Sequence, residues 1–355
     1  NYLLKNDKIT KAKKILNNSL KSSPRNLILN QLKIDLNNNR KETSYNKFNC
    51  RKISDVVAEI FYITASALSS QSLYSLSNFY LNIAKFLNPN FISFETLYAE
   101  NLYRINNLEK AKIVYKKIKK QGSVYDWYAS KQIANIMLKN KKKTEALKLL
   151  TKSYEKILNP EIYVTYDFAE FLRNNEKFEK SIIQYSEVLK SINKDHYLYA
   201  GASEGRGVAF ERSDKWQQAE KDLLNSLSAS PDQAYVINYL AYSWIEKGIN
   251  IEKSLKMLEK ANELKKNDGY IIDSLGWALY KLKRYKKAKE YLKLAVRIMP
   301  SDPIVNDHFG DSLWMNNQNI QARYYWNYVL NLEKTEPKLK KTIKKKLIFG
   351  LSTKS

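Results

Sequence analysis

The most constraining feature of this sequence is a pair of small residues that returns about every 34 or 35 positions. In each pair, a small residue is followed twelve positions later, or thirteen in one case, by a second small residue. The pairs are Ala65/Ser77, Ala99/Ala111, Ala134/Ala146, Ala169/Ser181, Gly207/Ala219, Ala241/Ser254, Gly276/Ala288 and Gly310/Ala322. Their first members are separated by 34, 35, 35, 38, 34, 35 and 34 residues, a regularity that indicates a repeated structural unit.

This spacing is typical of two antiparallel helices that pack closely. Small residues facing each other let the two backbones approach, and large residues around them fill the remaining space. Such a pair leaves one apolar face uncovered until a neighbouring pair covers it, so the units form arrays. Prolines close several units, at Pro89, Pro160, Pro231 and Pro300, because proline cannot continue the helical hydrogen-bond ladder. The phase predicts eight units between residues 58 and 336.

The composition agrees with a helical protein. The chain has 9 Gly and 7 Pro in 355 residues, well below the average usage of about 12% for the two together. All-β sandwiches and collagen-like chains depend on such residues and are therefore excluded. A hydrophobic fraction of 44% with 12% aromatics excludes a wholly disordered chain. A coiled coil is the poorer alternative, because no heptad is sustained.

Residues that carry catalytic or metal chemistry are scarce. Cys50 is the single cysteine, and His196 and His308 are the two histidines, far apart in sequence. Neither a disulfide nor a zinc site can be built from them. The sequence also lacks a phosphate-binding glycine loop, a nucleophile elbow and an HExxH motif. We therefore expect a protein that is not an enzyme and that has no cofactor or metal.

The repeated units resemble the tetratricopeptide repeat family. The likeness is clearest within residues 269–302, through Leu275, Gly276, Tyr280, Tyr285, Ala288, Leu292, Ala295 and Pro300. The resemblance implies an all-α fold, a right-handed superhelical solenoid of antiparallel helix pairs. After Pro337, the apolar residues Leu339, Ile343 and Leu347 recur every fourth position and predict a C-terminal capping helix.

The phase also suggests a domain organisation. Residues 1–53 form an N-terminal helical or degenerate repeat region, with helices expected over 11–24 and 26–38 and a loop or distorted unit over 37–50. Residues 54–199 form an N-terminal array and residues 200–336 a C-terminal array, with the 38-residue step near residues 194–200 between them. Residues 337–355 form the capping helix and tail.

In this family, set positions of each first helix line a concave groove. In the last three units the groove residues would include Tyr235, Asn238, Tyr242, Tyr270, Asp273, Trp277, Tyr280, Asp307, Asp311 and Trp314. This strip is acidic and aromatic in a chain of net charge +25. We expect exposed aspartates that attract a basic peptide and rigid aromatics that supply contact area. The alternative is that the aromatics pack between helices and the aspartates are helix caps or surface charges.

The function implied is a non-catalytic bacterial scaffold or adaptor that binds protein or peptide partners in this groove. A narrower resemblance covers residues 234–333, where NYLAYSWIEKG, NDGYIIDSLGWALYKL and SDPIVNDHFGDSLW resemble the C-terminal repeats of proteobacterial proteins. Some of those relatives are outer-membrane lipoproteins that act as adaptors for a periplasmic carboxyl-terminal processing protease. The resemblance implies the periplasm or outer membrane, with the cytoplasm as the alternative. Because the chain begins at Asn1 without methionine, we expect that a leader or lipid attachment site has been removed, and peripheral membrane association would depend on it.

The alternative function is binding of a polyanion, either nucleic acid or an anionic membrane surface. The net charge of +25 supports it, but the lysines are dispersed and no nucleic-acid recognition motif is present. One stretch, residues 60–84, contains no charged residue. Ten of its residues are Ser, Thr, Asn or Gln, so we expect a buried helix pair there rather than a membrane span.

Overall fold

The computed structural model describes residues 2–6, 8–39, 49 and 51–351. These residues fold into helices joined by short turns, and no strand occurs in the described ranges. The chain divides into two compact units, residues 1–184 and 185–355. The loop expected over residues 37–50 falls largely outside the described residues.

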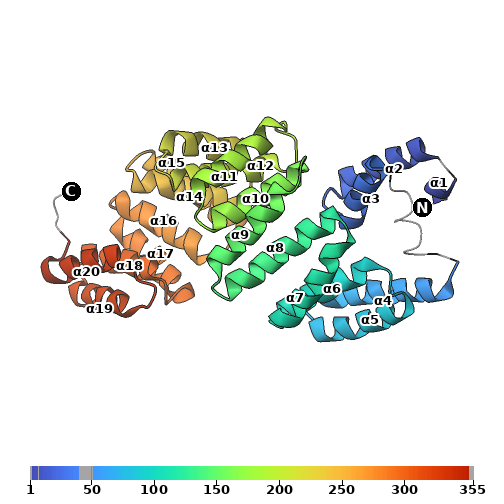
Figure 1. Cartoon of the computed structure of the whole chain (residues 1–355). Coiled ribbons are helices and arrows are strands. Elements are labelled where there is room, and N and C mark those ends of the chain that lie inside the picture. The colour runs from blue at the N-terminus through green and yellow to red at the C-terminus, as the bar shows by residue number, and fades with distance from the viewer. Residues whose placement is uncertain (1, 7, 40–48, 50, 352–355) are drawn as a thin grey trace. The chain divides into compact units, whose positions relative to one another are not determined.

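The N-terminal unit holds the first ten helices and the first part of the eleventh. They are α1 (Tyr2–Lys5), α2 (Ile9–Ser22), α3 (Leu27–Asn37), α4 (Ile53–Ser70), α5 (Tyr74–Leu87), α6 (Ile92–Arg104), α7 (Leu108–Ile118), α8 (Ser123–Lys139), α9 (Lys143–Glu155), α10 (Ile162–Asn174) and α11 (Phe178–Lys190). A short 3-10 turn, Lys119–Gln121, follows α7. From α4 to α9 the helices pair in sequence order, as the colours of Figure 1 allow the reader to follow.

The C-terminal unit begins within α11 and continues the same alternation. Its further helices are α12 (Tyr199–Glu211), α13 (Trp216–Ala229), α14 (Ala234–Glu246), α15 (Ile251–Leu264), α16 (Gly269–Lys281), α17 (Tyr285–Ile298), α18 (Pro303–Met315), α19 (Asn319–Asn331) and α20 (Pro337–Phe349). The predicted helix pairs are therefore confirmed, as is the helix after Pro337. The predicted domain boundaries and the handedness of the superhelix stay predictions.

The small residues of the repeat lie where the two helices of each pair meet. Every alanine and serine of the eight predicted pairs is fully buried, with 0% exposure. Contact is direct in the first pair, where the Ser77 hydroxyl donates a hydrogen bond of 2.7 Å to the Ala65 carbonyl. Glycine is required where the approach is closest: a Cβ on Gly276 would lie 2.6 Å from Leu292 Cγ. A small residue is thus needed because the facing helix occupies the space of a side chain.

The turn inside each pair uses a left-handed backbone conformation. One residue with positive φ follows the first helix in most pairs: Ser72, Asn106, Lys141, Glu176, Asp214, Lys283 and Asn317. A left-handed residue just past a helix end stops the helix and turns the chain. The pair with thirteen-residue spacing, Ala241/Ser254, carries its extra residue in this turn, which contains both Gly248 and Asn250 with positive φ.

In the N-terminal unit, α3 packs against α8 rather than against its sequence neighbour α4. Gln31 Oε1 accepts a hydrogen bond of 3.0 Å from the Val124 backbone N–H. Ion pairs join Arg25 to Asp167 at 2.9 Å and Lys33 to Glu161 at 2.7 Å. These contacts across more than ninety residues of sequence fix α3 on the first helices of later pairs.

The charge-free stretch of residues 60–84 forms the helix pair α4–α5, as expected, but the pair is not fully buried. Ile60 is 57% exposed, Ile63 61% and Phe79 58%. The expectation of a buried pair was wrong because the outer faces of both helices carry apolar residues that no described element covers. Among the described residues, α4 is long and apolar enough to cross a membrane by length and composition.

Candidate partner-binding groove

The first helices of the C-terminal unit lie next to one another, with α14 against α16 and α16 against α18. Their predicted groove residues therefore form rows that run across the helices at the repeat spacing. The structure places these residues in three different environments, namely an exposed row, a buried cluster and a half-buried set. The three environments give the predicted residues different roles.

The exposed row is formed by the first turn of each helix. Tyr235 is 52% exposed, Tyr270 58% and Ile304 43%. The Tyr235 hydroxyl donates a hydrogen bond of 2.9 Å to Asp268 Oδ2, and the Lys265 ammonium lies 3.9 Å from the centre of the Tyr235 ring. Asp268 also caps α16, accepting from the Tyr270 backbone N–H at 3.1 Å. The row is therefore apolar and aromatic, and Tyr235 is held in place by neighbours.

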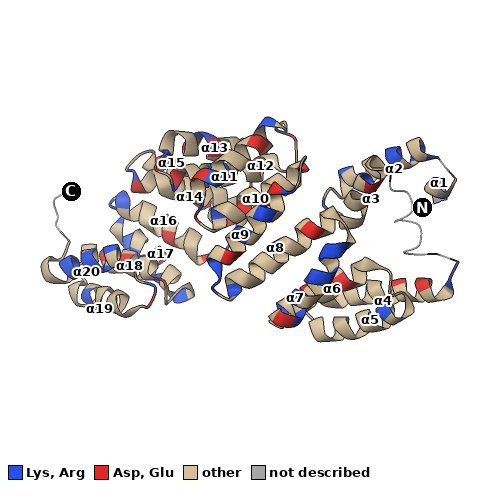
Figure 2. Cartoon of the chain, viewed as in Figure 1, with Lys and Arg blue, Asp and Glu red and all other residues tan. Residues whose placement is uncertain are grey.

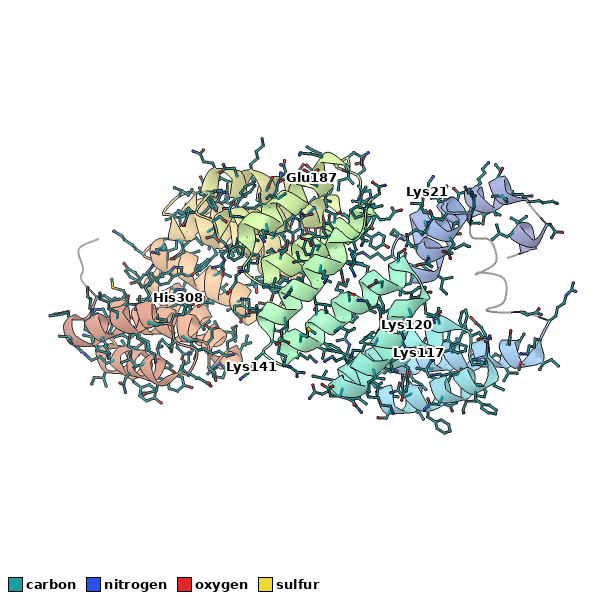
Figure 3. All side chains as sticks on the ribbon, in the orientation of Figure 1. Lys21, Lys117, Lys120, Lys141, Glu187 and His308 are labelled. Atoms are coloured by element: carbon teal, nitrogen blue, oxygen red, sulfur yellow. The ribbon has the colours of Figure 1, made fainter. Side chains whose placement is uncertain are left out.

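A buried cluster surrounds Asp273, which is 5% exposed. His308 Nδ1 lies 3.1 and 3.0 Å from the two carboxylate oxygens of Asp273. The His308 ring stacks on Trp277 at 3.9 Å, and Trp277 stacks on Tyr280 at 4.6 Å. The Trp277 Nε1–H donates to Glu246 at 2.7 Å. Trp277 is thus held by two stacked rings and by a hydrogen bond from its indole nitrogen, and His308 is labelled in Figure 3.

The second part of the buried cluster joins α18 to the capping helix. The Lys346 ammonium lies 2.6 Å from Asp307 Oδ1 and 2.7 and 2.8 Å from the two carboxylate oxygens of Asp311. The Trp326 Nε1–H donates to Asp311 at 3.0 Å. All three charged side chains are nearly buried, with 12% exposure or less.

The expectation of exposed aspartates was therefore wrong for Asp273, Asp307 and Asp311. Each carboxylate is buried and bound by a basic or polar group of the same chain, because a buried charge is stable only with a partner. A basic peptide cannot reach them without displacing His308 or Lys346. The aspartates of the acidic strip predicted from the sequence are therefore paired with groups of the same chain.

Burial and neighbouring charges shift the proton affinities in this cluster. Burial raises the pKa of Asp311, and the Asp307 carboxylate adds to the increase. Burial by itself lowers the pKa of His308, but the Asp273 carboxylate outweighs it and the net pKa is raised. The pKa of Lys346 is also raised, since the two aspartates outweigh its desolvation. Asp273 and Asp307 thus favour the charged forms of the two basic groups.

The remaining predicted residues, Asn238, Tyr242, Tyr280 and Trp314, are half-buried. The Asn238 Oδ1 atom is buried without a hydrogen-bond partner. Trp314 lies against Gly350, where a Cβ would come within 2.0 Å of its ring. Arg323 also lies over the Trp314 ring at 4.9 Å. The end of the chain therefore covers part of the strip at Trp314.

Sequence reasoning missed His308, Lys346 and Glu246, which hold this cluster together. A signal was present, because Asp273 and His308 are 35 residues apart, as are Asp311 and Lys346. The 34-residue step from Gly276 to Gly310 makes Asp307 the repeat equivalent of Asp273, so each basic residue lies one position beyond the repeat equivalent of its aspartate. Within the described residues, no group of three or more His, Cys, Asp and Glu side chains could hold a metal ion.

Comparisons with known proteins identify the repeat. A tetratricopeptide repeat model matches residues 270–302. A TPR repeat-containing protein of Pseudomonas aeruginosa is 29% identical over 178 residues, which is 50% of this chain and 29% of that protein. The chain thus spans less than a third of the curated relative that it matches.

Solved structures that match part of this chain include two proteins. One is MamA from Desulfovibrio magneticus RS-1, with 15% identity, a TM-score of 0.43, and coverage of 51% of this chain and 99% of that one. Another is YrrB, described as a TPR protein with an unusual peptide-binding site, with 17% identity, a TM-score of 0.42, and coverage of 55% and 97%.

Proposed function

The chain belongs to the tetratricopeptide repeat proteins, and on that premise we propose that it is a non-catalytic scaffold that binds a peptide segment along the C-terminal unit. The observation that carries the proposal is the exposed row of Tyr235, Tyr270 and Ile304. Large apolar side chains held in a row at repeat spacing offer contact area with little loss of side-chain entropy on binding.

The chemistry of the row favours an apolar or aromatic peptide rather than a strongly basic one. The aspartates beneath the row are already paired with His308 and Lys346. Beside the row, Lys265 and Asp268 offer one charge of each sign to the peptide backbone or its side chains. Recognition would therefore rest on contact with tyrosine rings and on hydrogen bonds at the rim.

Peptide selection from a phage-displayed library, followed by measurement of Kd for the enriched peptide, tests this proposal. The variant Tyr235→Ser/Tyr270→Ser should weaken binding about tenfold or more, because burying one large apolar side chain contributes about 1.5–3 kcal/mol. The matched control is Tyr324→Ser/Ile320→Ser on α19, whose side chains are 67% and 84% exposed. Equal Kd values for the two variants would contradict the proposed site.

A finer proposal follows from the sequence resemblance of residues 234–333. We propose that the partner is a carboxyl-terminal processing protease of the bacterial cell envelope, for which the scaffold acts as an adaptor. Mixing the purified chain with such a protease and measuring complex formation by sedimentation velocity tests it. Failure to form a complex would exclude the protease as the partner. It would not contradict the proposed peptide-binding row.

A further inference from the structure

The outer face of α5 is apolar and exposed. The buried face of this helix is formed by Ser77, Leu81 and Ala84. On the opposite face, apolar residues recur with helical spacing at Leu76, Phe79, Ile83 and Phe86. Leu76 is 46% exposed, Phe79 58% and Phe86 86%. In a folded protein, an exposed apolar strip of this kind marks a contact surface.

The next second helix, α7, and the 3-10 turn that follows it carry lysines at three of these four positions of the repeat. A step of 34 residues, the distance from Ser77 to Ala111, takes Leu76 to Lys110, Phe79 to Ile113, Ile83 to Lys117 and Phe86 to Lys120. Ile113 is 67% exposed, and Lys110, Lys117 and Lys120 are exposed as well. In Figure 2, α5 is almost entirely uncharged while α7 carries several charged segments.

Other second helices do not repeat this apolar face. The equivalent positions are Glu145, Lys148, Lys152 and Glu155 in α9, and Lys253, Lys256, Lys260 and Glu263 in α15. The repeat architecture itself therefore does not require apolar residues there, and the Lys-rich composition would not place them there. The strip on α5 is a local property of this part of the chain.

A shared ion pair holds the faces of α5 and α7 beside each other. The ammonium groups of Lys85 on α5 and Lys117 on α7 lie 2.8 and 2.6 Å from the same oxygen of Glu95 on α6. Glu95 is 4% exposed, whereas the Lys85 and Lys117 side chains are 43% and 59% exposed, so a buried carboxylate anchors two lysines that remain at the surface. Beyond it lies a depression at the end of α7, lined by Ile113, Lys116, Lys117, Lys119, Lys120 and Asp126, and Lys117 and Lys120 are labelled in Figure 3. The single carboxylate of this lining, Asp126, is paired with Lys119 at 3.1 Å.

We propose that this combined face of α5 and α7 binds an anionic membrane surface. Phe79 and Phe86 would enter the interface between headgroups and acyl chains, and the lysines of α7 would contact the anionic headgroups. Apolar residues beside lysines are the pattern of helices that lie on a membrane. The outer strip of α5, formed by Leu76, Phe79, Ile83 and Phe86, contains no charged side chain, so its entry into the interface desolvates no charge of the strip itself. The proposal does not depend on the peptide-binding row.

Flotation of the full chain with lipid vesicles tests the proposal. Vesicles that contain phosphatidylglycerol should bind the protein, vesicles of phosphatidylcholine alone should bind it much less, and added salt should weaken the binding. Phe79→Ser/Phe86→Ser should lower the partition coefficient about tenfold or more. The control Leu158→Ser/Ile320→Ser removes two apolar side chains of 94% and 84% exposure elsewhere and should leave the coefficient unchanged.

A second pair of variants separates a local lysine site from the effect of net charge. Lys116→Glu/Lys120→Glu should lower binding to anionic vesicles about tenfold or more, since each lysine near the surface contributes to attraction. Lys256→Glu/Lys287→Glu, on exposed positions of α15 and α17, makes the same change in net charge. It should leave most of the binding intact.

Three results would overturn the proposal. Equal vesicle binding by the phenylalanine variant and the wild-type chain would remove the apolar strip from the contact. Concentration-dependent self-association that the phenylalanine variant abolishes, with no vesicle binding, would assign the strip to a second copy of the chain. Binding of duplex DNA that requires Lys116 and Lys120, but neither phenylalanine, would assign the basic face to nucleic acid.

Discussion

The Lys346 ammonium lies 2.6 Å from Asp307 Oδ1 and 2.7 Å from Asp311 Oδ1, and so joins α20 to α18. The capping helix α20 (Pro337–Phe349) begins 34 residues after α18 (Pro303–Met315), which is one repeat. The capping helix therefore places a lysine where the first helix of a further unit would stand. Its Ile343, with 0% exposure, completes the apolar contact with the last pair.

Removing this lysine should destabilise the C-terminal unit. In Lys346→Met, Asp307 and Asp311 are left buried without their cation, and breaking a buried ion pair costs about 3–5 kcal/mol. Chemical denaturation followed by circular dichroism measures the loss. Lys345→Met, at the exposed neighbouring position, should change the unfolding free energy by about 0.5 kcal/mol or less. A loss for Lys346→Met no larger than the control would show that the buried pair contributes little.

Enlarging Gly276 should separate α16 from α17. A Cβ at this position already meets Leu292 Cγ at 2.6 Å and the Leu292 backbone nitrogen at 3.2 Å. Gly276→Leu should therefore cost about 1–3 kcal/mol, the usual effect of overpacking, or more because backbone is involved. Thermal melting against Lys286→Leu, on the exposed side of the same pair, provides the comparison. Equal melting temperatures for Gly276→Leu and Lys286→Leu would contradict the repeat register on which the fold assignment rests.

The Asp273–His308 pair should make stability depend on pH. Since the folded pKa of His308 is raised above its unfolded value of about 6.5, its stabilisation is fully present below that pH. It is lost as the pH rises through the folded pKa. The difference in unfolding free energy between wild type and His308→Asn should therefore shrink from pH 6 upward. A constant difference across the range would show that His308 does not carry the charge.

His196 supplies a control of opposite sign. Burial lowers its pKa in the folded state, so protonation at low pH favours unfolding. At low pH, His196→Asn should therefore have a higher unfolding free energy than the wild-type chain. His308→Asn should have a lower one at the same pH. Measuring the unfolding free energy of both variants over the same pH range separates the effect of the Asp273–His308 pair from acid denaturation of the chain as a whole.

Asn101 should be a stabilising residue of the N-terminal unit. It is 1% exposed, and its amide donates to Ser77 Oγ at 2.8 Å and to Asn78 Oδ1 at 2.9 Å, while its oxygen accepts from Ser69 at 2.7 Å. Asn101→Ala would leave these groups short of partners and should cost about 1–3 kcal/mol. The exposed Asn82→Ala is the matched control by denaturation. Equal unfolding curves for the two variants would mean that water replaces the network without cost.

The groove shows where sequence reasoning stopped being sufficient. It correctly placed Tyr235 and Tyr270 at equivalent positions of adjacent helices, and both are exposed. It also predicted that Asp273 and Asp307 are exposed, although both are buried. The positions were read helix by helix, whereas burial depends on the partners that the neighbouring helices supply.

The sequence by itself determined the helix pairs and the capping helix. The pairs depend on contacts between residues twelve or thirteen positions apart, which the spacing of small residues records directly, and the capping helix shows in the four-residue spacing of Leu339, Ile343 and Leu347. Tertiary structure alone decided which charges pair, where α3 packs, and that the outer face of α5 stays uncovered. Those features depend on which side chains meet across a repeat or across the unit. An unpaired aspartate and a paired one look the same in the sequence. Only the distance to a cation in the folded chain distinguishes them.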